Sequence, residues 1–69
     1  MEKLRVYKAY KEKFVYKIRN KKYSLWSSLN FDYGRLIGML DILMIDGIID
    51  CEKYNREVNF LDELVQDEY

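Results

Sequence analysis

The chain has 69 residues, of which 49% are hydrophobic and 16% aromatic, and it carries 12 basic and 12 acidic side chains. A chain this short buries only about 60% of its unfolded surface, so its thin core must be densely packed or covered by another chain. The single cysteine excludes an internal disulfide, and the absence of histidine excludes the usual Cys/His zinc cage. We therefore predict one domain, residues 1–69, without metal or cofactor.

The zero net charge hides a division between two halves. Residues 1–29 carry nine Lys/Arg against two Glu, whereas residues 30–69 carry ten Asp/Glu against three Lys/Arg. Such asymmetry indicates charged partners, or attraction of the halves for one another or for a second copy. The alternative is a solvated surface on which the charges happen to cluster.

Strands are the first interpretation of the basic half, residues 1–29. Phe14, Tyr16 and Ile18 alternate with their neighbours at period two, which is typical of a strand. Residues 20–22 are a plausible turn, and residues 23–27 would return as a third strand. The tyrosine and β-branched content also favours strands.

A helix is the alternative for this half, because Tyr7, Tyr10, Phe14 and Ile18 align on one helical face. Several β-branched and aromatic neighbours fall off that face. We expect an α+β domain, in which a three-stranded antiparallel meander precedes a helical hairpin. An all-α three-helix domain is the alternative.

The acidic half, residues 30–69, carries the clearer signals. Residues 31–46 and 51–66 are predicted to form two helices joined by a tight turn. Gly47 supplies the left-handed residue that ends the first helix, and Asp50 is the expected N-cap of the second.

The first of these helices is apolar nearly all round. Asn30 and Asp32 are its N-cap candidates. Leu36, Leu40 and Leu43 align on one side, and Met39 and Ile42 continue the apolar surface round the other side. A helix of this kind is central to its fold or covered by a partner. A homo-oligomer that pairs basic with acidic faces and covers the surface around Met39 and Ile42 is one alternative.

Catalytic chemistry has little material in this sequence. Without histidine there is no general base near neutral pH, and the three glycines match no phosphate-binding loop. The carboxylate neighbours Asp62/Glu63 and Asp67/Glu68 are expected on or after an exposed helix surface, as solvated side chains. We predict that the chain is not an enzyme.

Two binding surfaces are predicted instead. The basic strands would hold single-stranded nucleic acid by phosphate pairing and base stacking, through Arg5, Tyr7, Lys13, Lys17, Arg19 and Trp26. Lysine on exposed strands equally protects against aggregation. The acidic helices would present carboxylates to a protein surface that normally holds DNA or RNA, through Glu52, Asp62, Glu63, Asp67 and Glu68.

The stretches Trp-Ser-Ser-Leu at 26–29, Tyr-Gly-Arg-Leu-Ile-Gly-Met-Leu-Asp at 33–41 and Asp-Gly-Ile-Ile at 46–49, with Tyr54, carry a resemblance. They resemble short proteins of phages and mobile elements in low-GC Gram-positive bacteria. Neighbours of such proteins include anti-CRISPR inhibitors, which are mostly non-enzymatic and often bind a Cas effector where nucleic acid would lie. The resemblance implies a phage-type inhibitor of a host protein, most concretely a Cas nuclease, and carries over no functional residue.

A cytoplasmic location in the bacterial host is expected. The longest apolar stretch, residues 36–49, is interrupted by aspartates and is shorter than the roughly 20 residues that span a bilayer. The lone Cys51 suits a reducing compartment.

The leading hypothesis for the function is a host-protein inhibitor. The alternative is a small accessory protein that binds single-stranded nucleic acid.

Overall fold

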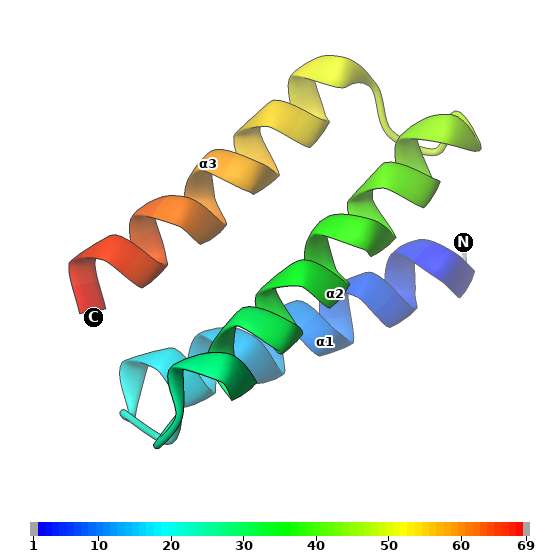
Figure 1. The fold of residues 1–69 in the computed structure, drawn as a ribbon. Coiled ribbons are helices and arrows are strands. Elements are labelled where there is room, and N and C mark those ends of the chain that lie inside the picture. Colours follow the sequence, from blue (N-terminus) through cyan, green and yellow to red (C-terminus); the bar gives the residue numbers. More distant parts are fainter. Residues whose placement is uncertain (1, 69) are drawn as a thin grey trace.

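Three helices make up most of the chain in the computed structural model, which describes residues 2–68 (Figure 1). Helix α1 spans Glu2–Arg19, α2 spans Trp26–Ile45 and α3 spans Cys51–Glu68. Helix α2 runs antiparallel to both of the others (Figure 1). The bundle measures 35 × 20 × 17 Å along its principal axes.

The predicted three-stranded meander is wrong, because residues 2–19 form helix α1 and residues 2–68 contain no strand. Tyr7, Phe14 and Ile18 recur at helical spacing and are the buried residues of α1. The period-two pattern was misleading because Phe14 and Ile18 also lie one helical turn apart, and so short a window fits both periods. Tyr16, which lies between them, is 58% exposed. The all-α three-helix alternative is confirmed.

The expected turn at residues 20–22 exists, but it ends a helix rather than joining two strands. Lys22 N–H donates to the Lys17 carbonyl at 2.9 Å and Lys21 N–H donates to the Ile18 carbonyl at 3.2 Å. This hydrogen-bond pair closes the end of a helix around one left-handed residue. Here that residue is Lys21, with a φ of 53°. An extended connection through Leu25 then leads into α2.

The predicted helical hairpin is confirmed, with a different starting point. Helix α2 begins at Trp26, so Asn30 and Asp32 lie inside it and neither is its N-cap. Leu25 occupies the N-cap position and forms no side-chain cap. The polar residues were misleading as start signals because the first turn of α2 begins without a polar cap.

The turn between α2 and α3 forms as the sequence predicts. Gly47 has a φ of 74°, Gly47 N–H donates to the Met44 carbonyl, and Ile48 N–H donates to the Leu43 carbonyl. Asp50 caps α3, since Lys53 N–H donates to its Oδ1 at 2.8 Å. Both inter-helix turns therefore begin with the same type of helix end.

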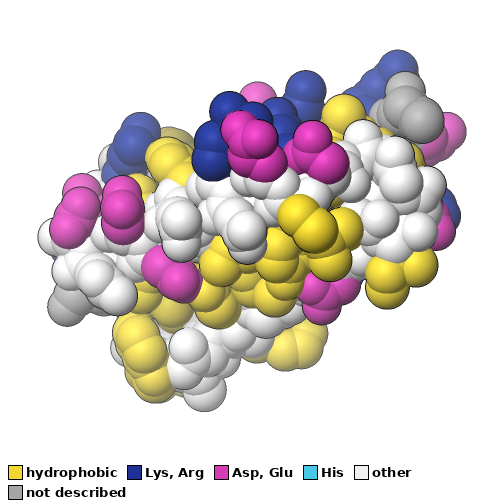
Figure 2. All heavy atoms as spheres, turned by 90° about the horizontal axis from the view of Figure 1, so that it is seen from above, with side chains coloured by type: hydrophobic (Ala, Val, Ile, Leu, Met, Phe, Trp, Pro, Cys, Tyr) yellow, Lys and Arg dark blue, Asp and Glu magenta, His cyan; other side chains and the backbone are white. Residues whose placement is uncertain are grey.

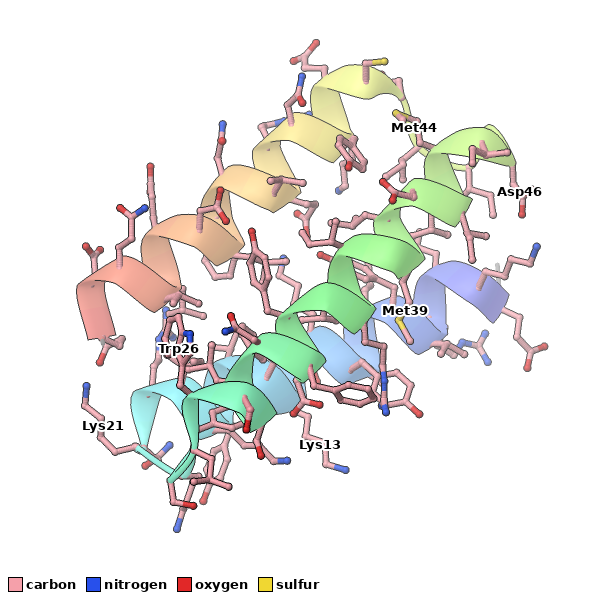
Figure 3. The ribbon with its side chains drawn as sticks, in the orientation of Figure 1. Lys13, Lys21, Trp26, Met39, Met44 and Asp46 are labelled. Carbon is pink, nitrogen blue, oxygen red and sulfur yellow. The ribbon has the colours of Figure 1, made fainter. Side chains whose placement is uncertain are left out.

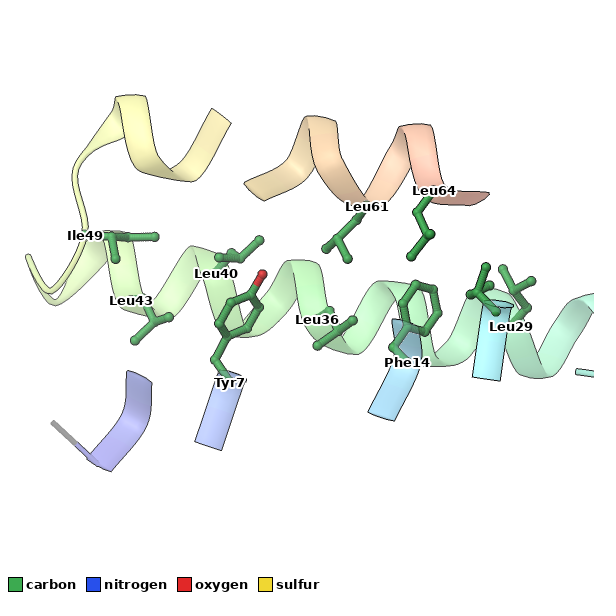
Figure 4. Packing of buried hydrophobic residues seen from close by; sticks show 10 residues of the cluster. Tyr7, Phe14, Leu29, Leu36, Leu40, Leu43, Ile49, Leu61 and Leu64 are labelled. Atoms are coloured by element: carbon green, nitrogen blue, oxygen red, sulfur yellow. The ribbon is translucent and has the colours of Figure 1, made fainter. Parts of the chain in front are cut away.

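One hydrophobic core joins the three helices (Figure 4). Helix α2 contributes its leucine stripe, which we define as Leu29, Leu36, Leu40 and Leu43 and which is at most 1% exposed. The other buried residues are Tyr7, Phe14 and Ile18 of α1, Ile49 of the turn, and Leu61 and Leu64 of α3. The side of α2 opposite the leucine stripe is left without a covering helix, and Ile42 and Ile45 on it are 52% and 79% exposed.

The glycines make a direct test of this fold. A Cβ at Gly38 would meet nothing within 4 Å, so Gly38→Ala is expected to raise the free energy of unfolding by up to about 1 kcal/mol. Gly47→Ala should lower it by about 1–2 kcal/mol, because its positive φ disfavours a side chain. Urea unfolding followed by circular dichroism measures both. Changes of the same sign in the two variants would contradict this arrangement.

Candidate binding surfaces

Tyrosine hydroxyls donate to carboxylates along the seams between the helices. Three of these hydrogen bonds join two helices, and the fourth joins the α1–α2 connection to α2. The pairs are Tyr7 with Glu57 at 2.6 Å, Tyr54 with Asp41 at 2.6 Å, Tyr33 with Asp62, and Tyr23 with Asp32 at 2.5 Å. Each ring packs against or within the core while its hydroxyl reaches an acidic residue at the core boundary.

Glu57 of α3 accepts two hydrogen bonds from side chains of α1. Its Oε1 accepts from the Tyr7 hydroxyl at 2.6 Å and from Lys11 Nζ at 2.7 Å. Burial of this carboxyl favours its neutral form, but the hydrogen bonds from Lys11 and Tyr7 and the charges of Lys11 and Lys53 outweigh burial and lower its pKa. Glu57 is therefore ionised wherever the bundle is folded near neutral pH.

The same seams raise the pKa of the tyrosines. Burial, followed by the hydrogen bond to Asp62, raises the pKa of Tyr33 to about 12. Burial and Glu57 raise the pKa of Tyr7, and the hydrogen bond to Asp41 raises that of Tyr54. These hydroxyls stay protonated as donors, so they serve the packing of the helices and not acid–base chemistry near neutral pH.

Ion pairs use part of the charge asymmetry inside the molecule. Lys3 meets Asp46 at 2.5 Å, Lys11 meets Glu57 at 2.7 Å, Lys21 meets Glu68 at 3.9 Å and Lys17 meets Asp32 at 4.0 Å. Each pair joins a cation of residues 1–29 to an acid of residues 30–69. Figure 2 shows one face of the molecule, on which Lys and Arg side chains gather along an edge with Asp and Glu directly beside them.

The acidic residues predicted to bind a protein do not form one surface. Asp62 accepts from Tyr33, and Glu68 lies within ion-pair distance of Lys21. Glu52 is exposed and faces Arg56 on the same helix at 4.0 Å. Glu63 and Asp67 are exposed. The set spans the length of α3, and only some of its members are available to a partner.

The residues predicted to bind nucleic acid are also dispersed, because the segments predicted as strands belong to helices α1 and α2 and to the connection between them. Tyr7 is 3% exposed and belongs to the core, which excludes it from a binding surface. Trp26 and Lys13 lie on opposite sides of α2 in Figure 3. Arg5 and Arg19 are exposed on α1, and Lys17 is half-buried beside Asp32.

A basic–aromatic hollow between α1 and α2 was missed by sequence reasoning. It has a volume of about 70 Å³ and is lined by Tyr10, Lys13, Phe14, Lys17, Tyr23, Asp32, Arg35 and Leu36. The Arg35 guanidinium lies 5.2 Å from the centre of the Tyr10 ring and 5.3 Å from that of Phe31. Phe31 and Arg35, four residues apart on a helix, were the available sequence signal.

An apolar groove lies farther along the same two helices, toward the end of α2. It has a volume of about 240 Å³, and its lining residues are Glu2, Lys3, Val6, Met39, Ile42 and Leu43. Figure 3 shows Met39 on α2, with Asp46 farther along beside the start of α1. We call Val6, Met39, Ile42 and the adjacent Ile45 the apolar face.

The remaining features of residues 2–68 concern a metal site, a membrane-spanning helix and the cysteine. Within residues 2–68, no group of three or more Cys, Asp or Glu side chains is arranged to hold a metal ion. Across the same residues, no helix is both long and apolar enough to cross a lipid bilayer. Cys51 is exposed, and its sulfur lies 3.8 Å from that of Met44.

Glu57→Gln is expected to lower the free energy of unfolding at neutral pH by about 1–3 kcal/mol, because a charged acceptor is lost from two hydrogen bonds. The native protein should lose this contribution as the pH falls below the ordinary carboxyl value of 4.5, because its folded-state pKa is lowered. The stability of Glu57→Gln should therefore depend less on pH in that acidic range. Urea unfolding at several pH values, with exposed Glu63→Gln as the control, measures both effects. Equal acid sensitivity of Glu57→Gln and the native chain would contradict this role.

Comparison with known proteins assigns no family to the chain. No protein-family model matches it, and no curated protein or solved structure is significantly similar to it.

Proposed function

We propose that the chain is a non-enzymatic protein that binds another protein through the apolar face. The observation that carries this proposal is the exposure of Ile42 and Ile45, at 52% and 79%, on the helix that supplies the leucine stripe. Exposed apolar residues that are contiguous, rather than scattered, mark interaction surfaces. Val6 is 42% exposed across the groove and continues the apolar surface onto α1.

The composition of this surface supports protein binding. Its centre is aliphatic, and charged groups lie at its edge, where Lys3 pairs with Asp46 and Glu2 lines the groove. An apolar centre with a polar rim is the usual anatomy of protein–protein interfaces. Full burial of an isoleucine side chain contributes about 1.5–3 kcal/mol, so two such residues supply much of the affinity of a specific complex.

Gly38 supports the same surface. It lies one helical turn before Ile42, and a Cβ built on it would meet nothing within 4 Å. The internal packing of the bundle therefore does not require a glycine at this position. The missing side chain lowers the surface next to Ile42, which would let a partner approach the α2 backbone.

The partner proposed is a host protein, and the resemblance to small phage proteins makes a Cas nuclease the most concrete choice. The exposed carboxylates Glu63 and Asp67 belong to the second half of α3, whereas the apolar face is made by α1 and α2. They would contribute through long-range attraction to a basic protein surface, which speeds association more than it adds affinity.

The double variant Ile42→Glu/Ile45→Glu tests this proposal. We expect it to weaken partner binding by at least about 100-fold, because each substitution removes an apolar contact worth roughly tenfold or more. Both side chains are mostly exposed, so circular dichroism should show an unchanged helix content. Tyr16→Glu is the matched control, since Tyr16 is 58% exposed on another face and its replacement should leave binding unchanged.

The measurement has two parts. Affinity capture from a nuclease-treated lysate of CRISPR-bearing Gram-positive cells should retain a partner with the native chain and Tyr16→Glu but not with the double variant. Binding and DNA cleavage by purified Cas nuclease then test the most concrete partner. Full binding by the double variant would exclude the apolar face. Failure of the native chain to bind a Cas nuclease would remove the anti-CRISPR version.

A further inference from the structure

We propose that the basic–aromatic hollow between α1 and α2 binds the phosphate backbone of single-stranded nucleic acid, with neighbouring bases stacked on exposed aromatic rings. The site uses Lys13, Lys17 and Arg35 as cations and Phe31 and Tyr10 as rings. It shares no residue with the apolar face, so the inference does not rest on the protein-binding proposal.

The charges that line the hollow favour an anion. Three cations meet a single acid there, Asp32. The Asp32 carboxylate already accepts from the Tyr23 hydroxyl at 2.5 Å and lies 4.0 Å from Lys17. Within residues 2–68, neither Lys13 nor Arg35 has an ion-pair or hydrogen-bond partner. The hollow therefore has an excess of positive charge that no side chain of the bundle neutralises.

Arg35 lines the hollow and lies beside two aromatic rings. The Tyr10 and Phe31 rings lie 5.2 and 5.3 Å from its guanidinium carbon, which fixes the group by cation–π contact. A guanidinium held in this way keeps its N–H donors for bidentate binding of phosphate. The hollow itself, at about 70 Å³, suits a compact anionic group better than a ring system.

A second hollow extends the site along the α1–α2 connection. It is more open, at about 500 Å³, and shares Lys17, Tyr23 and Asp32 with the first. It adds one cation, Lys22, and the three hydroxyl groups of Ser24, Ser27 and Ser28. Two adjoining hollows with donors and cations match a chain of phosphates better than a single ion.

The aromatic residues distinguish nucleic acid from other polyanions. Phe31 lines the second hollow and is 66% exposed, and Tyr10 lines the first and is 40% exposed. Bases stack on such rings whatever their sequence, whereas an acidic peptide gains little from them. The combination of cations, hydroxyls and open rings therefore favours a single strand of DNA or RNA.

Fluorescence anisotropy with labelled oligothymidylate and oligouridylate tests the inference. Three phosphate contacts predict that affinity falls about 20-fold between 50 and 200 mM salt. Lys13→Gln and Arg35→Gln should each weaken binding. Each should also make the slope of log affinity against log salt concentration shallower, by the contribution of about one phosphate contact. Phe31→Ala should weaken binding at least about fivefold while leaving the salt dependence unchanged.

Lys8→Gln is the matched control, because it removes one positive charge from an exposed position of α1 outside both hollows. It should leave binding close to that of the native chain, as should the Ile42→Glu/Ile45→Glu variant. Polyglutamate should not compete with the oligonucleotide. The inference is overturned by absence of binding at 50 mM salt, by equal losses in the control variants, or by equal competition from polyglutamate.

Discussion

The bundle depends on the leucine stripe of α2. Its four side chains are at most 1% exposed and lie between buried residues of α1 on one side and of α3 on the other. Residues 2–68 contain no second cluster of buried hydrophobic residues to compensate for its loss. Because both outer helices pack on this single stripe, the opposite side of α2 is left facing solvent. The core and the exposed apolar face are therefore two sides of one helix.

The polar seams then determine how the outer helices sit on α2. Leucine packing alone would tolerate small shifts of one helix along another. Tyr7 and Lys11 converge on Glu57, and Tyr33 and Tyr54 each reach a carboxylate across the α2–α3 seam. A shift of one helical turn would leave these partly buried groups without partners, at a cost larger than an average hydrogen bond is worth. The separation of basic and acidic halves thus serves, in part, to align α1 with the rest of the chain.

The sequence predicts the α2–α3 hairpin well because its signals are local. Gly47 and Asp50 act within one turn of themselves, through a positive φ and an N-cap. Helix α1 was misassigned because its pattern over residues 14–18 fits both periods, and the contact that resolves the ambiguity, Tyr7 with Glu57, spans fifty residues. The basic–aromatic hollow was missed for the same reason, since Arg35 meets Tyr10 only when α1 packs on α2.

Gly34 and Gly38 lie in the middle of α2, and the packing of the bundle requires neither of them to be glycine. Neither has a positive φ, and at neither would a Cβ meet another atom, so alanine fits both sites. A glycine inside a helix costs about 1 kcal/mol relative to alanine, and domains have only about 5–15 kcal/mol of stability in total. The natural chain therefore folds with a smaller margin than its own backbone permits. A more stable version lies only one or two substitutions away, and it would have a bulkier outer surface on α2.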